Sequence, residues 1–215
     1  MSEHDHDHTH DDEHATPDAA RNALRAEALE SLLVERGLVL PQVIDALIRR
    51  FEEDIGPLNG AKAVARAWVD PAYRARLLSD AGSAIGELGV VAIPAQAPLV
   101  VVANSPSEHN LVVCTLCSCY PNGLLGLPPA WYKSPAYRSR AVREPRRLLA
   151  EMGLALPETV QIRVWDSSAE LRYMVLPERP PGTDGMSEEA LQALVTRDAL
   201  IGVANPKQPS GGDHG

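Results

Sequence analysis

The residues of this sequence best suited to chemistry are three cysteines within a six-residue stretch, Cys114, Cys117 and Cys119. They are all the cysteines that the chain contains. Because they lie so close together in sequence, they cannot cross-link distant parts of a secreted fold. Thiolate sulfur is a strong ligand for transition metals. The cluster therefore predicts a metal site.

The i, i+3, i+5 spacing also brings backbone nitrogens into reach of the ion. If the sulfurs of Cys117 and Cys119 bind one metal, the amide of Ser118 and that of Cys119 lie between them and can complete a plane of two sulfurs and two nitrogens. Cys114 would then be an axial ligand, and a sixth position would stay open. Backbone amides bind only a strongly Lewis-acidic ion, so this arrangement favours trivalent cobalt or iron over tetrahedral zinc. An open position on such an ion is a reaction site, and thiolates beside it can be oxidised to sulfenic and sulfinic acids.

Two other interpretations of the cluster stay open from the residues alone. The three cysteines could form a structural zinc site with His109, although the Cys-x-Cys step is tight for one. They could also be buried thiols without a ligand in an apolar strand. Of the seven histidines, only His109 falls inside the predicted folded body. This disfavours hydrolases that use a Ser-His-Asp or Cys-His arrangement.

Composition and charge limit the possible partners. A chain of 215 residues with 45% apolar composition can form one substantial core preceded by a smaller helical arm. The net charge of -9 argues against a nucleic acid or an anionic membrane as partner. No apolar run approaches the roughly 20 residues that span a bilayer, and the N-terminus does not resemble a signal peptide. We expect a cytoplasmic protein with small-molecule or protein partners.

The region before the cysteines is predicted to be helical after a polar tail. Residues 1–16 alternate His and Asp, which predicts a disordered tail that either captures metal transiently or is a solvated acidic leader. Between residues 17 and 90, apolar residues recur at three- and four-residue spacing. The predicted helices start at Pro17 with Gly37 as C-cap, and continue at 41–55, 61–69, 71–78 and 83–88.

The cysteines themselves follow a predicted strand. Runs rich in β-branched residues predict strands at 99–102, 111–113, 160–164 and 171–175, with turns at 104–106 and 166–168. A basic helical region runs through Leu149, and a last helix begins at Ser187. The sequence thus predicts a helical region at 17–90, an α/β metal-binding domain at 91–205 and a flexible tail at 206–215. The cluster lies where the second strand gives way to a loop.

The stretch Val113-Cys-Thr-Leu-Cys-Ser-Cys-Tyr120 resembles the metal-claw motif of nitrile hydratase alpha subunits. The similarity extends from roughly residue 25 to 205, through stretches that include residues 55–61, 67–71, 126–134, 162–170 and 195–198. The resemblance implies an α/β (α+β) subunit in which a helical N-terminal arm precedes a four-layered α-β-β-α body. It also implies hydration of a nitrile to an amide, which is a carbon-oxygen lyase reaction.

The resemblance assigns roles within the claw. The implied ligands are the sulfurs of Cys114, Cys117 and Cys119 and the amides of Ser118 and Cys119. Cys117 would be oxidised to sulfinic acid and Cys119 to sulfenic acid, and these two would be the catalytic residues. Either the Cys119 sulfenate or a nearby water would attack the nitrile carbon.

The same resemblance implies a metal and partners. Thr115, together with Tyr120, resembles the cobalt type and implies low-spin Co(III), with iron less favoured. The implied partner is a nitrile hydratase beta subunit, as one chain or split into two, with an activator or metallochaperone as a further candidate. Arginines of the beta subunit would hydrogen-bond the oxidised sulfurs.

The sequence departs from the family beside the claw. Asn122 and Gly123 stand where the family usually has Trp and Pro, and that Trp lines the substrate pocket. Gln96 lies approximately where the family places a pocket glutamine. We therefore expect Gln96 and Asn122 to line a larger, more polar pocket that takes a bulky nitrile.

The sequence is also compatible with two alternative functions. The metal subunit of a thiocyanate hydrolase shares the claw and often has a His-rich terminus. A noncatalytic cobalt-binding or delivery protein is suggested by the His-rich tail, but such a protein should release its metal to a chelator.

Overall fold

The computed structural model describes residues 17–49, 58–90, 97–117 and 119–209. Its contacts divide the chain into two compact units, Met1–Arg49 and Arg50–Gly215. The predicted tail at 1–16, the end of the predicted helix 41–55 and the last residues of the predicted tail at 206–215 lie outside the described residues. No helix in the described part of the chain is both long and apolar enough to cross a membrane.

The described residues of the first unit, 17–49, are mainly helical, as predicted. It contains α1 (Pro17–Glu35) and α2 (Pro41–Arg49). Gly37 follows α1 with a φ of 65°, and Leu38 donates a backbone hydrogen bond of 2.9 Å to the carbonyl of Leu33. Glycine adopts this left-handed conformation at a helix C-terminus without steric cost. The predicted C-cap is therefore confirmed.

The second unit opens with three consecutive helices, α3 (Leu58–Val69), α4 (Pro71–Ser79) and α5 (Ala81–Gly86). The Asp70 carboxylate accepts a hydrogen bond from the amide of Tyr73 and begins α4, while Asp80 does the same for the amide of Ser83 in α5. Although the sequence groups these helices with α1 and α2, they belong to the second unit, where α4 and α5 contact β1 (Leu99–Ala103).

Four strands were predicted, and the structure has strands at all four places. After β1 come β2 (Glu108–Val113), β3 (Gln161–Asp166) and β4 (Arg172–Leu176). Within the described residues β1 pairs with β4 and β2 with β3, both in parallel. β1 and β2, which follow each other in sequence, are therefore in different sheets, and so are β3 and β4. The register places Val113 opposite Asp166, so both strands end at the same edge.

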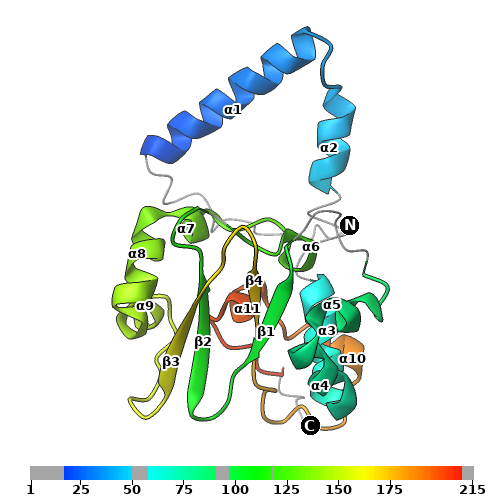
Figure 1. Cartoon of the computed structure of the whole chain (residues 1–215), viewed down its shortest axis with the longest axis vertical. Coiled ribbons are helices and arrows are strands. Elements are labelled where there is room, and N and C mark those ends of the chain that lie inside the picture. The colour runs from blue at the N-terminus through cyan, green and yellow to red at the C-terminus, as the bar shows by residue number, and fades with distance from the viewer. Residues whose placement is uncertain (1–16, 50–57, 91–96, 118, 210–215) are drawn as a thin grey trace, which may run out of the picture. The chain divides into compact units, whose positions relative to one another are not determined.

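Helices cover both sides of this pair of sheets (Figure 1). On one side α8 (Pro135–Arg143) contacts β2 and α9 (Pro145–Glu151) contacts β3. On the other side the helices α3 to α5 lie beside β1, and α10 (Glu188–Gln192) packs on α3. The predicted four-layered α-β-β-α body is therefore confirmed.

Three short helices were not predicted. They are α6 (Asn122–Leu125), α7 (Ala130–Lys133) and α11 (Arg197–Ile201). α6 lies among the prolines and glycines of residues 121–129, and α7 directly follows Pro129. The third contacts both β4 and β2, and its residues Leu200 and Ile201 are buried.

A buried polar network joins the strands at the end of β2 away from the cysteines. His109 is buried, and its Nε2 lies 2.8 Å from the carbonyl of Gly202 while its Nδ1 lies 3.2 Å from the side-chain nitrogen of Asn104. The Trp165 indole N–H donates to the side-chain oxygen of Asn110 at 2.7 Å. A Cβ at Gly202 would lie 2.0 Å from the Asn110 carbonyl oxygen, so this close approach requires glycine. Because both ring nitrogens of His109 contact groups of this network, His109 has a structural role in the fold.

Candidate metal centre

The structure brings the three cysteines together in the loop of residues 114–119, which we call the claw loop. Cys114 directly follows β2, and the three sulfurs lie within 4.8 Å of one another. The Cys117 sulfur is 3.5 Å from that of Cys114 and 3.1 Å from that of Cys119. None of them forms a disulfide. One ion can therefore contact all three sulfurs.

His109 is not a member of this cluster. Among the described residues, the group of His, Cys and carboxylate side chains close enough to hold one ion contains the three cysteines alone. The Nε2 of His109 is 2.8 Å from the carbonyl of Gly202. The alternative zinc site with His109 as fourth ligand therefore does not form.

The sulfurs differ in their exposure to solvent. Cys114 is fully buried and Cys119 is 9% exposed, whereas Cys117 is exposed. The pKa of the Cys119 thiol is raised to about 12, mainly by burial and in smaller part by hydrogen bonds with Cys117 and Cys114. Three thiolates at such distances repel one another unless a cation offsets their charge. The donor set therefore fits a thiophilic transition-metal ion that displaces the thiol protons.

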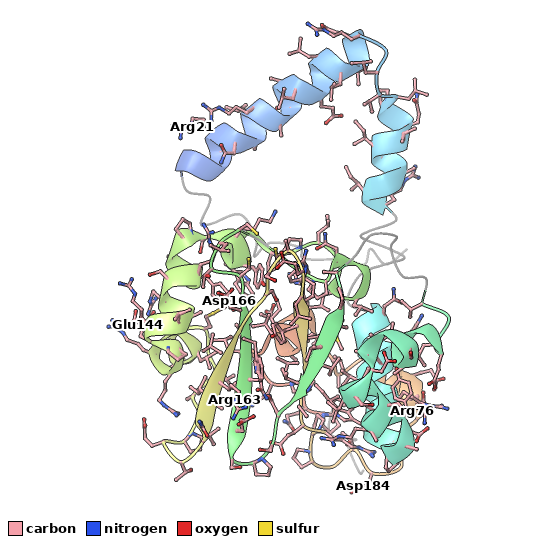
Figure 2. All side chains as sticks on the ribbon, in the orientation of Figure 1. Arg21, Arg76, Glu144, Arg163, Asp166 and Asp184 are labelled. Atoms are coloured by element: carbon pink, nitrogen blue, oxygen red, sulfur yellow. The ribbon has the colours of Figure 1, made fainter. Side chains whose placement is uncertain are left out.

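Asp166 fixes the first residue after Cys114 in the claw loop. Its Oδ1 accepts a hydrogen bond of 2.9 Å from the Thr115 amide, and its Oδ2 accepts one of 2.5 Å from the Thr115 hydroxyl. Because Asp166 pairs with Val113 in the sheet, its carboxylate lies at the edge where the claw loop begins (Figure 2). The amide of Cys117 in turn lies 3.3 Å from the Cys114 sulfur.

Arg138 contacts the claw loop from α8. Its Nη1 donates to the carbonyl oxygens of Thr115 and Cys117, at 3.4 Å and 3.3 Å. The neighbouring Tyr137 is buried and donates a hydrogen bond of 2.7 Å from its hydroxyl to the carbonyl of Val112. This bond fixes α8 against the end of β2, and Arg138 with it.

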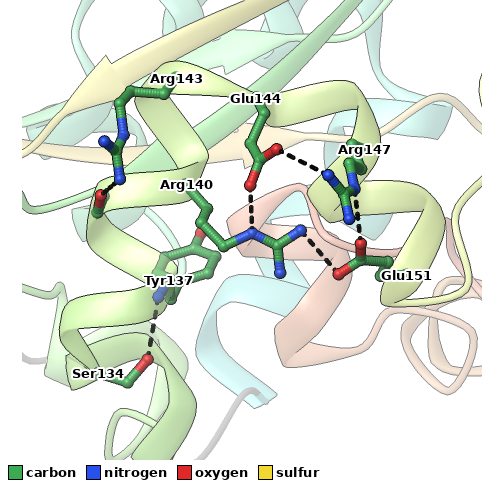
Figure 3. Close-up of polar contacts among 8 residues, drawn as sticks. Ser134, Tyr137, Arg140, Arg143, Glu144, Arg147 and Glu151 are labelled. Carbon is green, nitrogen blue, oxygen red and sulfur yellow. Dashed lines mark hydrogen bonds and ion pairs between the residues drawn. The ribbon is translucent and has the colours of Figure 1, made fainter.

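Ion pairs connect α8 to α9 (Figure 3). Arg140 lies 2.6 Å from Glu144 and 2.7 Å from Glu151, and Arg147 lies 3.0 Å from Glu151. At the other end, the Ser134 hydroxyl accepts a hydrogen bond of 3.1 Å from the Tyr137 amide and begins α8. Both ends of the helix that carries Arg138 are thus fixed locally.

An aromatic cluster supports the claw loop from the protein interior. The buried Tyr132 hydroxyl donates a hydrogen bond of 2.9 Å to the carbonyl of Cys119. The Tyr132 ring lies 5.1 Å from that of Tyr120 and 5.7 Å from that of Tyr137, and Trp131 lies 4.9 Å from Tyr137. The Tyr120–Tyr132 and Trp131–Tyr137 pairs are edge-to-face, an arrangement that is stabilising at such distances. Burial raises the pKa of Tyr132, so its hydroxyl is protonated and can donate.

The other predicted site residues are described only in part. Ser118 and Gln96 lie outside the described residues. Asn122 begins α6, and its side-chain oxygen is buried without a hydrogen-bond partner among the described residues. The sequence did not identify Arg138, Asp166, Tyr132 or Tyr137 as residues of the site. The one signal for them was that all four fall in segments that resemble the family.

Three clustered sulfurs at the end of a parallel strand, held by an α/β body, define a metal-binding protein with a thiolate centre. The family described as Nitrile hydratase, alpha chain, matches residues 20–204. The chain therefore belongs to the nitrile hydratase alpha-chain family, which confirms the resemblance.

Named relatives cover most of the chain. It is 56% identical over 188 residues to the low-molecular weight cobalt-containing nitrile hydratase subunit alpha of Rhodococcus rhodochrous, a match covering 87% of this chain and 90% of the relative. It is 47% identical over 190 residues to the thiocyanate hydrolase subunit gamma of Thiobacillus thioparus, covering 84% and 78% of the two chains. The solved structure of an iron-type nitrile hydratase variant from Comamonas testosteroni Ni1 is similar with a TM-score of 0.80 and 45% identity, covering 88% and 92%.

Proposed function

We propose that this chain is the metal-holding alpha subunit of a cobalt nitrile hydratase, which hydrates a nitrile to the corresponding amide. The observation that carries the proposal is the group of three sulfurs within 4.8 Å in a chain of this family. The proposed ligands are the sulfurs of Cys114, Cys117 and Cys119 with the backbone amides of Ser118 and Cys119. When bound, low-spin Co(III) supplies the Lewis acidity that makes a nitrile carbon electrophilic.

Cobalt is favoured over iron by the relatives and by two residues of the chain. The Rhodococcus relative at 56% identity is named as cobalt-containing, whereas the iron-type structure is 45% identical. Thr115 and Tyr120 also resemble the cobalt type. The Thr115 hydroxyl is bound by Asp166, and Tyr120 is buried beside Tyr132, so both positions touch the residues that hold the claw loop.

Cys117 and Cys119 are the proposed catalytic residues. Oxidised to sulfinic and sulfenic acid, they would present oxygen atoms beside the reaction site. The Cys119 sulfenate would either attack the nitrile carbon or take the proton of an attacking water. The hydrogen bond from Tyr132 to the Cys119 carbonyl fixes the backbone from which this group projects.

We also propose a beta subunit as partner, either as one chain or split into two. The exposure of the claw loop supports this proposal. Cys117 is exposed and Leu116 is 86% exposed, so the described residues of the second unit leave this part of the claw loop open to water. A substrate site needs concave walls and a controlled supply of water. The first unit supports a protein partner too, since its leucines at positions 24, 29 and 38 are 67%, 61% and 68% exposed. An activator that delivers cobalt is a further proposed partner.

We propose a bulky nitrile as substrate. Asn122 begins α6 three residues after Cys119, where the family usually has a Trp, and Gln96 is the second pocket residue. A smaller side chain at the pocket wall leaves more room. The Asn122 side-chain oxygen, which has no hydrogen-bond partner among the described residues, offers an acceptor to a polar substrate.

The proposal is tested on the full chain expressed with cobalt and its beta partner. We expect about one chelator-resistant cobalt per chain, as a kinetically inert trivalent ion gives. Intact mass should show one sulfinic and one sulfenic acid, and nitriles should be converted to amides. Removable zinc, unoxidised thiols and no amide would instead indicate a structural metal or a delivery protein.

A second candidate is the metal subunit of a thiocyanate hydrolase. It is favoured by the 47% identity to the Thiobacillus subunit. The same preparation should be assayed with thiocyanate. Thiocyanate turnover without nitrile turnover would replace the first proposal, and the reverse would exclude the second.

A further inference from the structure

Arg138 binds the backbone of the claw loop and not its sulfur atoms. Its Nη1 lies 3.3 Å from the carbonyl oxygen of Cys117 and 3.4 Å from that of Thr115. By the covalent structure of the chain, the Cys117 carbonyl belongs to the same peptide group as the nitrogen of Ser118. Arg138 therefore contacts the peptide whose nitrogen is one of the two proposed amide ligands.

This contact has an electrostatic consequence once a metal is present. A peptide nitrogen that ligates a trivalent ion carries negative charge, which resonance shares with the carbonyl oxygen of the same peptide. A guanidinium that donates to this oxygen then makes a charge-assisted hydrogen bond, which is roughly twice as strong as a neutral one. Arginine also keeps its positive charge at every pH at which proteins are stable.

We propose that Arg138 is a positioning residue of the metal centre, which holds the Cys117–Ser118 peptide in its ligating orientation and balances the charge of its carbonyl oxygen. The inference rests on the proposed function, because it requires ligation by the Ser118 nitrogen. It adds a group from this chain to the arginines expected from the beta subunit.

The surroundings of Arg138 support a role in orientation. Asp166 accepts from the amide and hydroxyl of Thr115, while Arg138 donates to the carbonyl of the same residue. Thr115 is thus held from both sides by opposite charges. Since α8 is attached to β2 through Tyr137 and Val112, the fold of this chain itself places the guanidinium beside the claw loop.

The same helix offers a matched control. Arg143 is exposed and donates to the Ser139 hydroxyl one turn earlier, away from the claw loop. Substitution of Arg143 removes an equal charge from the same helix and leaves the Thr115 and Cys117 carbonyls untouched. Gln and Lys are both good helix formers, so neither should unfold α8.

The test compares Arg138→Gln, Arg138→Lys and Arg143→Gln in the full chain expressed with cobalt and its beta partner. The readouts are the rate of cobalt loss to excess chelator and the wavelength of the sulfur-to-cobalt charge-transfer band. Loss of a group that orients a metal ligand typically costs about 10- to 100-fold in metal affinity. We expect Arg138→Gln to lose cobalt faster by about this factor and to shift the band. Arg138→Lys should show a smaller effect, because lysine keeps the charge but not the planar fork.

Arg143→Gln should match the wild type in both readouts. If Arg138→Gln also matches it, or lowers only the melting temperature, Arg138 supports the fold alone and the inference is wrong. If the wild-type complex itself holds no chelator-resistant cobalt, the proposed function fails and the inference fails with it. The wild-type sample therefore separates the two failures.

Discussion

The hydroxyl of Thr115 lies 2.5 Å from Oδ2 of Asp166, a residue 51 positions later in the chain. The Thr115 amide lies 2.9 Å from the other oxygen of the same carboxylate. One side chain at the end of β3 thus receives two hydrogen bonds from the residue that follows Cys114, the first cysteine of the claw loop. The position of the claw loop depends on this pair as well as on the cysteines.

Replacing Thr115 by Val should weaken the claw loop. Valine has nearly the shape of threonine but cannot donate to Asp166, so one of the two hydrogen bonds is lost. We expect the free energy of unfolding to fall by about 1 kcal/mol. This is less than a buried hydrogen bond to a charged group contributes, because Thr115 and Asp166 are both exposed. Urea denaturation measures this, with Thr115→Ser as control because serine keeps the hydroxyl. Equal losses in the two variants would contradict the role of the hydroxyl.

Two tyrosines allow the attachment of α8 to be measured. The Tyr137 hydroxyl donates to the Val112 carbonyl, so Tyr137→Phe should lower the free energy of unfolding by about 1 kcal/mol. Tyr73 is equally buried, but its hydroxyl has no hydrogen-bond partner among the described residues. Tyr73→Phe should therefore be neutral or stabilising. Urea denaturation measures both variants. If Tyr73→Phe lowers the free energy of unfolding as much as Tyr137→Phe does, this account is contradicted.

His109 should make stability depend on pH in the mildly acidic range. Burial lowers the pKa of His109 below its ordinary value of 6.5, although the contact with the Gly202 carbonyl opposes the shift. The unfolded chain therefore binds a proton that the folded chain does not, and stability is lost as pH falls below about 6.5. We expect His109→Asn to be less stable than the wild type at pH 8, with the difference shrinking towards pH 5.5. A difference in the free energy of unfolding that is the same at both pH values would contradict this.

Asn122 tests the proposed choice of substrate. Asn122→Trp restores the residue usual in the family and should narrow the pocket. We expect the ratio of kcat/KM for a bulky aromatic nitrile to that for acrylonitrile to fall by about tenfold or more, a typical effect of changing a pocket by a few carbon atoms. Asn122→Gln, which keeps the amide, is the control. If the wild type already hydrates acrylonitrile faster than every bulky nitrile, the proposed pocket is wrong.

Local signals made part of this structure predictable from the sequence. Gly37 predicted the end of α1, and Ser187 predicted the start of α10, because capping depends on residues a few positions apart. The spacing of the cysteines predicted their cluster for the same reason. The family resemblance supplied the layers of the fold, which periodicity alone does not determine.

Contacts between distant segments could not be predicted in this way. Nothing in β2 indicates that its partner is β3 and not the nearer β1, since parallel pairing is decided by the connections between the strands. Arg138 and Asp166 reach the claw loop only through that pairing and through the packing of α8. The five residues of α11 are too few to show a helical period.

The parallel pairing of β2 with β3 also fixes the order of events during biosynthesis. The ribosome delivers the three thiols well before Asp166, and a growing chain cannot pair β2 until β3 has emerged. Until then the thiols are accessible to oxidants and to other metals. The hydrogen bonds between Thr115 and Asp166, which hold the start of the claw loop, can therefore form only after the chain has been synthesised past Asp166.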